Sequence, residues 1–221
     1  MGMDLRVVVV GGHHVGYHAA RKLTDRGHEV VIVEKDQRRV EYLSDQYIGT
    51  VIHGDGGRRS VLRQAGLDRS DVVAALTGYG AMTNVGICTM ARDVAPGIDT
   101  VARIDHGDAD EYTGMVDSVV YPEELAAHAA TNEIVSVADG GVRTIEEVSA
   151  DLELVDVMVD PGAPAAGKRL ADVSFPRGSV VVADREGNQL PGPELVLNPG
   201  RRYVLAVHAD VSDEVVRLLR G

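Results

Sequence analysis

The sequence predicts an α/β protein in which a doubly wound parallel sheet is followed by a small α+β C-terminal domain. Three observations predict this fold. Short runs rich in Val and Ile alternate with amphipathic stretches over the first 120 residues, the first run leads into a glycine-containing turn, and Gly and Pro punctuation increases after Tyr121. Such apolar runs are typical of strands buried on both faces, and their alternation with helices implies right-handed βαβ units.

The first part of the chain contains six predicted strands, which fit two mononucleotide-binding halves. The strands are expected at 5–10, 29–33, 50–53, 71–76, 99–104 and 118–120, and helices near 15–26, 37–46, 58–65, 82–95 and 108–115.

From Tyr121 onward the pattern predicts a different kind of structure. Pro122 suits a helix start and acidic residues follow it, so a helix is expected at 122–137, and residues 138–151 are expected to lead the chain outward. Strands at 152–158, 179–183 and 202–207 and helices at 168–173 and 211–219 then form the small domain. We therefore divide the chain into a nucleotide-binding domain at 1–121, a helix and linker at 122–150, and a C-terminal domain at 151–221.

The composition narrows the classes of function. The formal net charge is −12 and no more than two basic residues are adjacent, which argues against nucleic acid as a partner. No apolar run approaches the roughly 20 residues of a membrane helix, and the N-terminus has no secretory signal pattern. Cys88 is the only cysteine, so an internal disulfide is excluded. Together these features predict a cytoplasmic protein without direct membrane insertion.

The segment VVVVGGHHVG resembles a Rossmann-like dinucleotide-binding turn. The first glycine of such a turn allows the tight bend, the last lets helix and strand pack closely, and the helix N–H groups face the pyrophosphate. The middle glycine is replaced by His13, whose imidazole could crowd the phosphates or donate a hydrogen bond to one of them. We predict cofactor contacts from Gly11, Gly12, His13, His14, Val15 and Gly16.

Glu34 follows the second predicted strand, 18 residues beyond Gly16. An acid there can accept hydrogen bonds from both ribose hydroxyls and would repel a 2′-phosphate, which favours NAD/NADH, or the ribose of ATP/ADP, over NADP. Lys35 is included as its neighbour in the site. The alternative is a Rossmann-like scaffold whose pocket binds nothing.

The two histidines His14 and His18 are spaced i, i+4 on the predicted first helix, so a metal site is conceivable. Because no carboxylate lies beside them in the sequence to complete a ligand set, solvated or phosphate-facing histidines are the favoured reading, and no metal site is predicted.

Further candidates follow the other strands, because ligands bind outside the carboxyl ends of a doubly wound sheet. Asp55 could bond an adenine amino group, or cap the helix at 58–65. Arg103 could balance phosphate charge, or pair with Asp55 or Asp105. The predicted cofactor site therefore also includes residues at or after the ends of the third, fourth and fifth strands, which are Asp55, Thr77, Gly78, Asn84 and Arg103.

Catalytic chemistry is not indicated. Hydride transfer needs an acid–base residue and a substrate pocket, usually from a sizeable second domain, and the C-terminal segment is small. The chain has no G-x-S-x-G, complete P-loop or HExxH motif. We therefore predict that the protein is not an enzyme and that nucleotide is sensed, with an NAD-dependent oxidoreductase as the least favoured alternative.

Over essentially its whole length, the chain resembles the TrkA-like regulatory proteins of potassium transport, the KTN/RCK family. The resemblance rests on the glycine loop with Glu34, on GDGGRRSVLRQAGLDRSDVVAALTG, on TNVGICTMA followed by VARID, and on Pro122-Glu123. The C-terminal domain adds PAAGKRLADVSFP and LNPGRRYVL. The chain departs from the family at His13 and at residues 79–82, where acidic residues are often found.

This resemblance implies an RCK_N (TrkA-N) domain that binds NAD(H) or ATP/ADP and an RCK_C (TrkA-C) domain that in some members binds another small ligand. It also implies dimerisation through the helix at 122–137 and a ring beneath a membrane channel or transporter. The expected function is a nucleotide-sensing regulatory subunit of a Trk/Ktr-type potassium uptake system or potassium channel. It would be a homo-oligomer, peripheral at the inner face of the membrane through a potassium-translocating partner. A regulator of another cation transporter or antiporter is the alternative.

Overall fold

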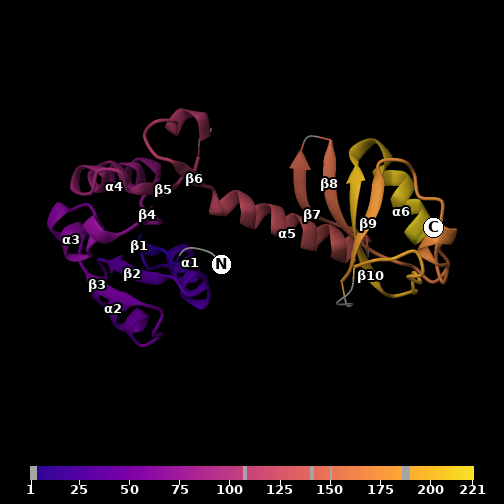
Figure 1. Cartoon of the computed structure of the whole chain (residues 1–221), viewed down its shortest axis with the longest axis horizontal. Coiled ribbons are helices and arrows are strands. Elements are labelled where there is room, and N and C mark those ends of the chain that lie inside the picture. Colours follow the sequence, from indigo (N-terminus) through magenta and orange to yellow (C-terminus); the bar gives the residue numbers. More distant parts are fainter. Residues whose placement is uncertain (1–3, 107–108, 140–141, 150, 186–189) are drawn as a thin grey trace. The chain divides into compact units, whose positions relative to one another are not determined.

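The computed structural model describes residues 4–106, 109–139, 142–149, 151–185 and 190–221. The chain divides into two compact units, Met1–Leu125 and Ala126–Gly221 (Figure 1).

The first unit contains a six-stranded parallel sheet in the order β3-β2-β1-β4-β5-β6. This order is that of the doubly wound dinucleotide-binding fold, with the topological switch between β1 and β4. The predicted fold class is therefore confirmed. The strands are β1 Arg6–Val10, β2 Glu29–Glu34, β3 Thr50–His53, β4 Val72–Ala75, β5 Asp99–Arg103 and β6 Ser118–Val120.

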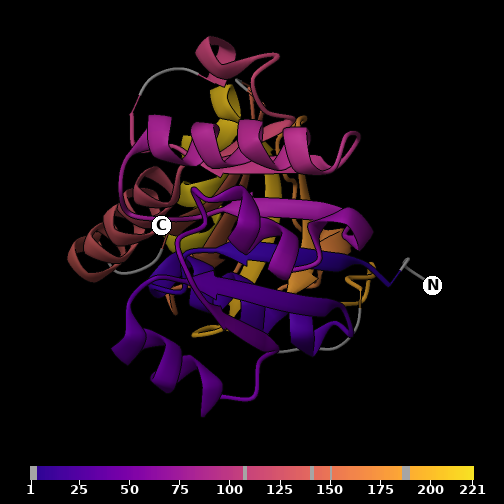
Figure 2. The ribbon, with the colours of Figure 1, turned by 90° about the vertical axis from the view of Figure 1, so that its left-hand side faces the viewer.

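Helices cover both faces of this sheet. Alternate valines of β1 point to opposite faces, so that Val7 and Val9 join one core while Val8 and Val10 join the other. The first core packs against α1 (His14–Asp25) and α2 (Gln37–Ser44), and the second against α3 (Arg59–Gln64) and α4 (Ala81–Val94). Figure 2 shows α4 and α2 on opposite sides of the strands.

Two predicted helices are much shorter in the structure. The helix expected at 108–115 is a single 3-10 turn, Ala109–Tyr112 (η2), and residues 107–108 lie outside the described residues. Gly114 has a φ of +82°, which ends helical geometry there, while the buried Tyr112 fixes the turn to the core. The helix expected at 168–173 is likewise a 3-10 turn, Leu170–Asp172 (η3).

The second unit contains an antiparallel sheet in the order β7-β8-β10-β9. Its core lies between this sheet and α6, with Tyr203, Leu205 and Leu219 fully buried. The helix α5 precedes the sheet along the chain (Figure 1). The elements are α5 Pro122–Asp139, β7 Val142–Ser149, β8 Leu152–Met158, β9 Ser179–Asp184, β10 Arg202–His208 and α6 Ser212–Arg220.

The strand β7 corrects the prediction that residues 138–151 only connect the domains. Its pairing with β8 shifts register twice, between Thr144 and Glu146 and between Glu147 and Ser149. Each shift breaks the two-residue alternation by which a strand is predicted from sequence. Among the described residues, no helix has the length and hydrophobicity needed to cross a membrane.

Candidate functional site

The turn between β1 and α1 requires glycine at two positions. Gly11 has a φ of +97°, and a Cβ there would lie 3.0 Å from the backbone of Thr77. A Cβ on Gly16 would lie 1.8 Å from the carbonyl oxygen of Gly11. The strand end, the turn and the first turn of α1 are thus packed backbone against backbone, as the glycine spacing predicts.

Glu34, the last residue of β2, is tied to this turn. Its buried carboxylate accepts from the Gly12 N–H at 2.7 Å through Oε2, and from the N–H groups of Lys35 and Asp36 at 2.8 and 2.9 Å through Oε1. A carboxylate offers about four acceptor sites, so most are used within the chain. Glu34 therefore organises the turn, and its contact with a ribose stays a prediction.

The histidines of the turn are exposed. His13 occupies the N-cap position of α1 with extended backbone, and its side chain makes no capping hydrogen bond. His14 is the first residue of the helix and His18 lies one turn further on. The half-buried Val15 packs against the core beneath them. Among the described residues, no group of three or more His, Cys, Asp or Glu side chains could hold a metal ion.

Thr77 and Asn84 are buried behind the turn and are joined by hydrogen bonds. The Asn84 Oδ1 accepts from the Thr77 hydroxyl at 2.7 Å and from its N–H at 3.1 Å, while Nδ2 donates to the carbonyls of Thr77 and Arg103. Asn84 therefore joins the ends of β4 and β5. Its side-chain contacts lie within the protein, so the structure gives it a structural role beside its predicted ligand contact.

Arg103 makes an ion pair that neither alternative named. Its Nη2 donates to Glu123 in the first turn of α5, whereas the structural alternative to a phosphate contact named Asp55 or Asp105. Asp105 instead accepts from the Ala81 N–H at 3.1 Å and pairs with His106. Desolvation raises the pKa of Asp105, but its hydrogen bonds and the imidazole of His106 outweigh it, and the net shift is downward. The expected Arg103 partners are therefore wrong.

Asp55 does not have the helix-capping role that was the alternative to a ligand contact. Its Oδ1 accepts from the Gly57 N–H at 2.9 Å, and α3 takes its N-cap from Arg58, so Asp55 does not cap that helix. The loop nevertheless approaches the site, because a Cβ on Gly56 would lie 2.2 Å from Val10 at the end of β1. Asp55 itself is exposed, and its Oδ2 lies 3.7 Å from Nε of Arg58.

Two side chains that the sequence did not single out as site residues lie at the turn. Arg39 of α2 donates from Nε to the Gly12 carbonyl at 2.7 Å. Tyr79, in the stretch without the usual acidic residues, has its ring 3.6 Å from the Lys35 ammonium. Because β1 lies between β2 and β4, this contact bridges the end of β1. Only the departure at residues 79–82 pointed to Tyr79, and nothing in the sequence pointed to Arg39.

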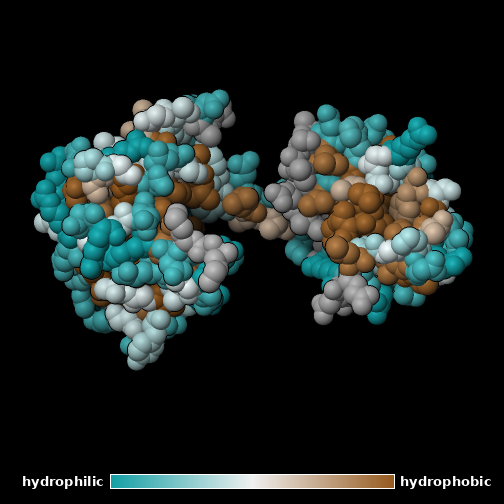
Figure 3. Space-filling view, in the orientation of Figure 1, coloured by the Kyte–Doolittle hydropathy of each residue, from teal (hydrophilic) through white to brown (hydrophobic). Residues whose placement is uncertain are grey.

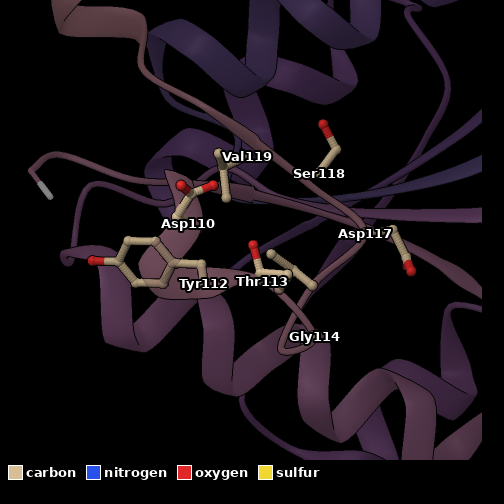
Figure 4. A pocket seen from close by; sticks show the side chains of 8 residues that line it. Asp110, Tyr112, Thr113, Gly114, Asp117, Ser118 and Val119 are labelled. Carbon is tan, nitrogen blue, oxygen red and sulfur yellow. The ribbon is translucent and has the colours of Figure 1, made fainter. Parts of the chain in front are cut away.

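Two hollows of the first unit lie at different places relative to this turn. One of about 20 Å³, room for about one water, is lined by Thr77, Gly78, Gly80, Asn84, Arg103 and Asp105. Gly78, which lines this hollow, is exposed to solvent. Another of about 310 Å³ lies between η2 and β6, at the edge of the sheet away from β1 (Figure 4).

Comparison with known proteins agrees with this architecture. The TrkA-N domain family matches residues 7–122 and the TrkA-C domain family matches residues 154–220. The Trk system potassium uptake protein TrkA homolog of Pyrococcus horikoshii is 28% identical over 223 residues, covering 96% of both chains.

Solved structures show the same fold at low identity. The GsuK channel bound to NAD has a TM-score of 0.67 at 17% identity, and the match covers 98% of this chain but 40% of that one. GsuK bound to ADP has a TM-score of 0.50 at 24% identity, covering 58% of this chain and 33% of that one. With both domain families present in order and a relative matched along its length, the chain belongs to the TrkA family of potassium-transport regulators.

Proposed function

We propose that this chain is a nucleotide-sensing regulatory subunit that binds NAD/NADH, with ATP/ADP as the alternative, at the turn formed by residues 11–16. The observation that carries the proposal is the Gly12–Glu34 hydrogen bond at the end of β1. It fixes a glycine turn at the N-terminus of α1, beside the topological switch, where doubly wound sheets bind nucleotides. The names of the solved neighbours, one with NAD and one with ADP, support both ligand classes.

The proposed role is regulation and not catalysis. Side chains around the turn are engaged in holding backbone, as with Glu34 and Asn84. A ligand regulates by binding two states of an assembly with different affinity, which needs a coupling of only about 1–3 kcal/mol.

The proposed partner is a potassium-translocating membrane subunit, reached by a homo-oligomer of this chain at the inner, cytoplasmic face of the membrane. The TrkA family membership supports this partner. Apolar side chains exposed along α5 support self-association. Potassium flux through the co-expressed translocator, measured with and without this chain, separates this proposal from regulation of another cation carrier.

Calorimetric titration with NAD, NADH, ATP and ADP tests the ligand. We expect at least one to bind with a Kd below about 1 mM. The variant His14→Glu places a negative charge at the first residue of α1, which suits the helix dipole but repels a phosphate. It should weaken binding about tenfold or more.

The matched control is His18→Glu, the same exposed substitution one turn further along α1. It should leave affinity within about twofold of wild type, because helix-end electrostatics fade within the first turn. Failure of the wild type to bind all four nucleotides would contradict the proposed site, as would equal losses in both variants.

A further inference from the structure

The two backbone polar groups of Gly12, which belong to neighbouring peptide groups, are each held by a side chain from a separate element. Its N–H donates to Glu34 at the end of β2, and its carbonyl accepts from Arg39 Nε at 2.7 Å. Both partners are charged, and hydrogen bonds of this kind are stronger than neutral ones. The two peptide groups that flank Gly12 therefore each have one favoured orientation, although glycine itself imposes little conformational restriction.

The guanidinium of Arg39 is itself held in place. It lies 4.5 Å from the ring centre of Tyr42 and 5.5 Å from that of Tyr17. Its N–H belongs to the first turn of α2, where the Asp36 side chain accepts from both Arg38 and Arg39. Packing against two rings reduces the freedom of the long side chain, so its hydrogen bond to Gly12 costs less entropy to form.

The orientation of the peptide between Gly12 and His13 matters for an anion. A carbonyl oxygen carries partial negative charge, and one turned toward a phosphate would repel it. The N–H of His13 belongs to the same trans peptide as the Gly12 carbonyl and points the opposite way, so it attracts an anion when the oxygen is turned away. Arg39 keeps the Gly12 oxygen on the α2 side of the turn. Without that bond, the oxygen loses the partner that holds it away from bound phosphate.

We propose that Arg39 is a positioning residue of the nucleotide site, which orients the peptide between Gly12 and His13 so that the turn accepts a diphosphate. This inference rests on the proposed function, since it assumes that a nucleotide diphosphate binds at the turn. It adds a residue from outside the turn and outside the glycine pattern to the determinants of affinity.

The experiment compares ADP and NADH binding by calorimetry in the full chain. Arg39→Met keeps the side-chain stem against the tyrosines but removes every N–H donor, and it should weaken both ligands about tenfold. Arg39→Lys restores a donor and should recover most of that loss. A role in packing alone would leave Met and Lys equal, so the rescue reports the hydrogen bond.

The matched control is Arg21→Met, which removes another guanidinium near Tyr17, at 5.8 Å, that makes no bond to the turn. Its affinity should stay within twofold of wild type. Circular dichroism establishes that each variant is folded, and Arg39→Leu, which also lacks a side-chain donor, replaces the Met variant if that one is not. Wild-type affinity in the Met variant, or equal losses for Met and Lys, would overturn the role of Arg39. Absence of binding in the wild type would instead refute the proposed function itself.

Discussion

Asp117 illustrates how one side chain stabilises the edge of the first sheet. Its Oδ2 accepts from both the N–H and the hydroxyl of the buried Thr100 at 2.7 Å, and Oδ1 pairs with Arg92. The hydrogen bond from Thr100, followed by that from Arg92, lowers the pKa of Asp117. The ionised carboxylate is therefore the form that the folded protein prefers.

This shift predicts a pH dependence of stability. Because the folded pKa lies below the unfolded value of about 4, the contribution of Asp117 is fully present above that value and is lost as pH falls through the folded pKa. Asp117→Asn should be less stable than wild type at pH 7, and the difference should shrink below about pH 4. Urea midpoints at pH 7, 5, 4 and 3 measure this, with Asp93→Asn as control for loss of one surface carboxylate. A constant difference across the series would refute it.

The residues of the site divide into those that sequence can predict and those that it cannot. The close backbone packing at Gly11 and Gly16 was predictable because its constraints are local to the turn, whereas the bond between Glu34 and Gly12 was not predicted and the ribose contact of Glu34 stays a prediction. The alternative role of Arg103, an ion pair, was given the wrong partners. Its partner in the structure, Glu123, lies 20 residues away on a different element. Arg39 was missed for the same reason, since only the folded α2 brings it to Gly12.

At the scale of whole elements, the period and the length of the apolar pattern in the sequence decide which helices and strands can be predicted. The six strands of the first sheet are predictable from their short runs rich in Val and Ile, and the structure confirms the doubly wound parallel sheet. The strand β7 was missed because two register shifts interrupt its alternation. The predicted helices at 108–115 and 168–173 are single 3-10 turns, because amphipathic spacing over so few residues does not distinguish a turn from a helix.

The helix α5 has large apolar side chains that are exposed to solvent. Ile134 and Val137, three residues apart and so on one face of the helix, are 69% and 85% exposed, and Figure 3 shows hydrophobic residues along this helix. Contiguous exposed apolar residues commonly mark an interaction surface. Self-association through α5 would bury them, as the family resemblance implies.

A charge on that surface should disrupt the oligomer. We expect sedimentation velocity to show wild type as a dimer or larger species and Ile134→Glu shifted toward monomer. Ala129→Glu is the matched control, since five residues at 3.6 per turn place it roughly 140° around the helix from Ile134. It should retain the wild-type distribution. A monomeric wild type, or identical behaviour of both variants, would exclude this interface.

The whole molecule carries a large excess of negative charge. The chain has 34 acidic and 22 basic residues, of which only Lys22, Lys35 and Lys168 are lysines. Like charges on a folded surface repel one another and destabilise the compact state, and salt screens them over a Debye length that falls from about 10 Å at 0.1 M to about 3 Å at 1 M. Two origins fit this composition: adaptation to high salt, and a GC-rich genome that favours arginine codons.

Salt dependence separates the two origins. If the acidic surface is an adaptation, Tm should rise steadily between 0.1 and 2 M KCl, because screening relieves a repulsion that the folded state concentrates. NaCl at equal ionic strength should raise Tm equally if screening is the cause, whereas a rise with KCl alone would indicate potassium binding to the folded chain. An equimolar series of sucrose controls for solute exclusion, which strengthens apolar burial without screening charge. A flat Tm across the KCl series would rule out adaptation to salt and leave the arginine bias to codon composition.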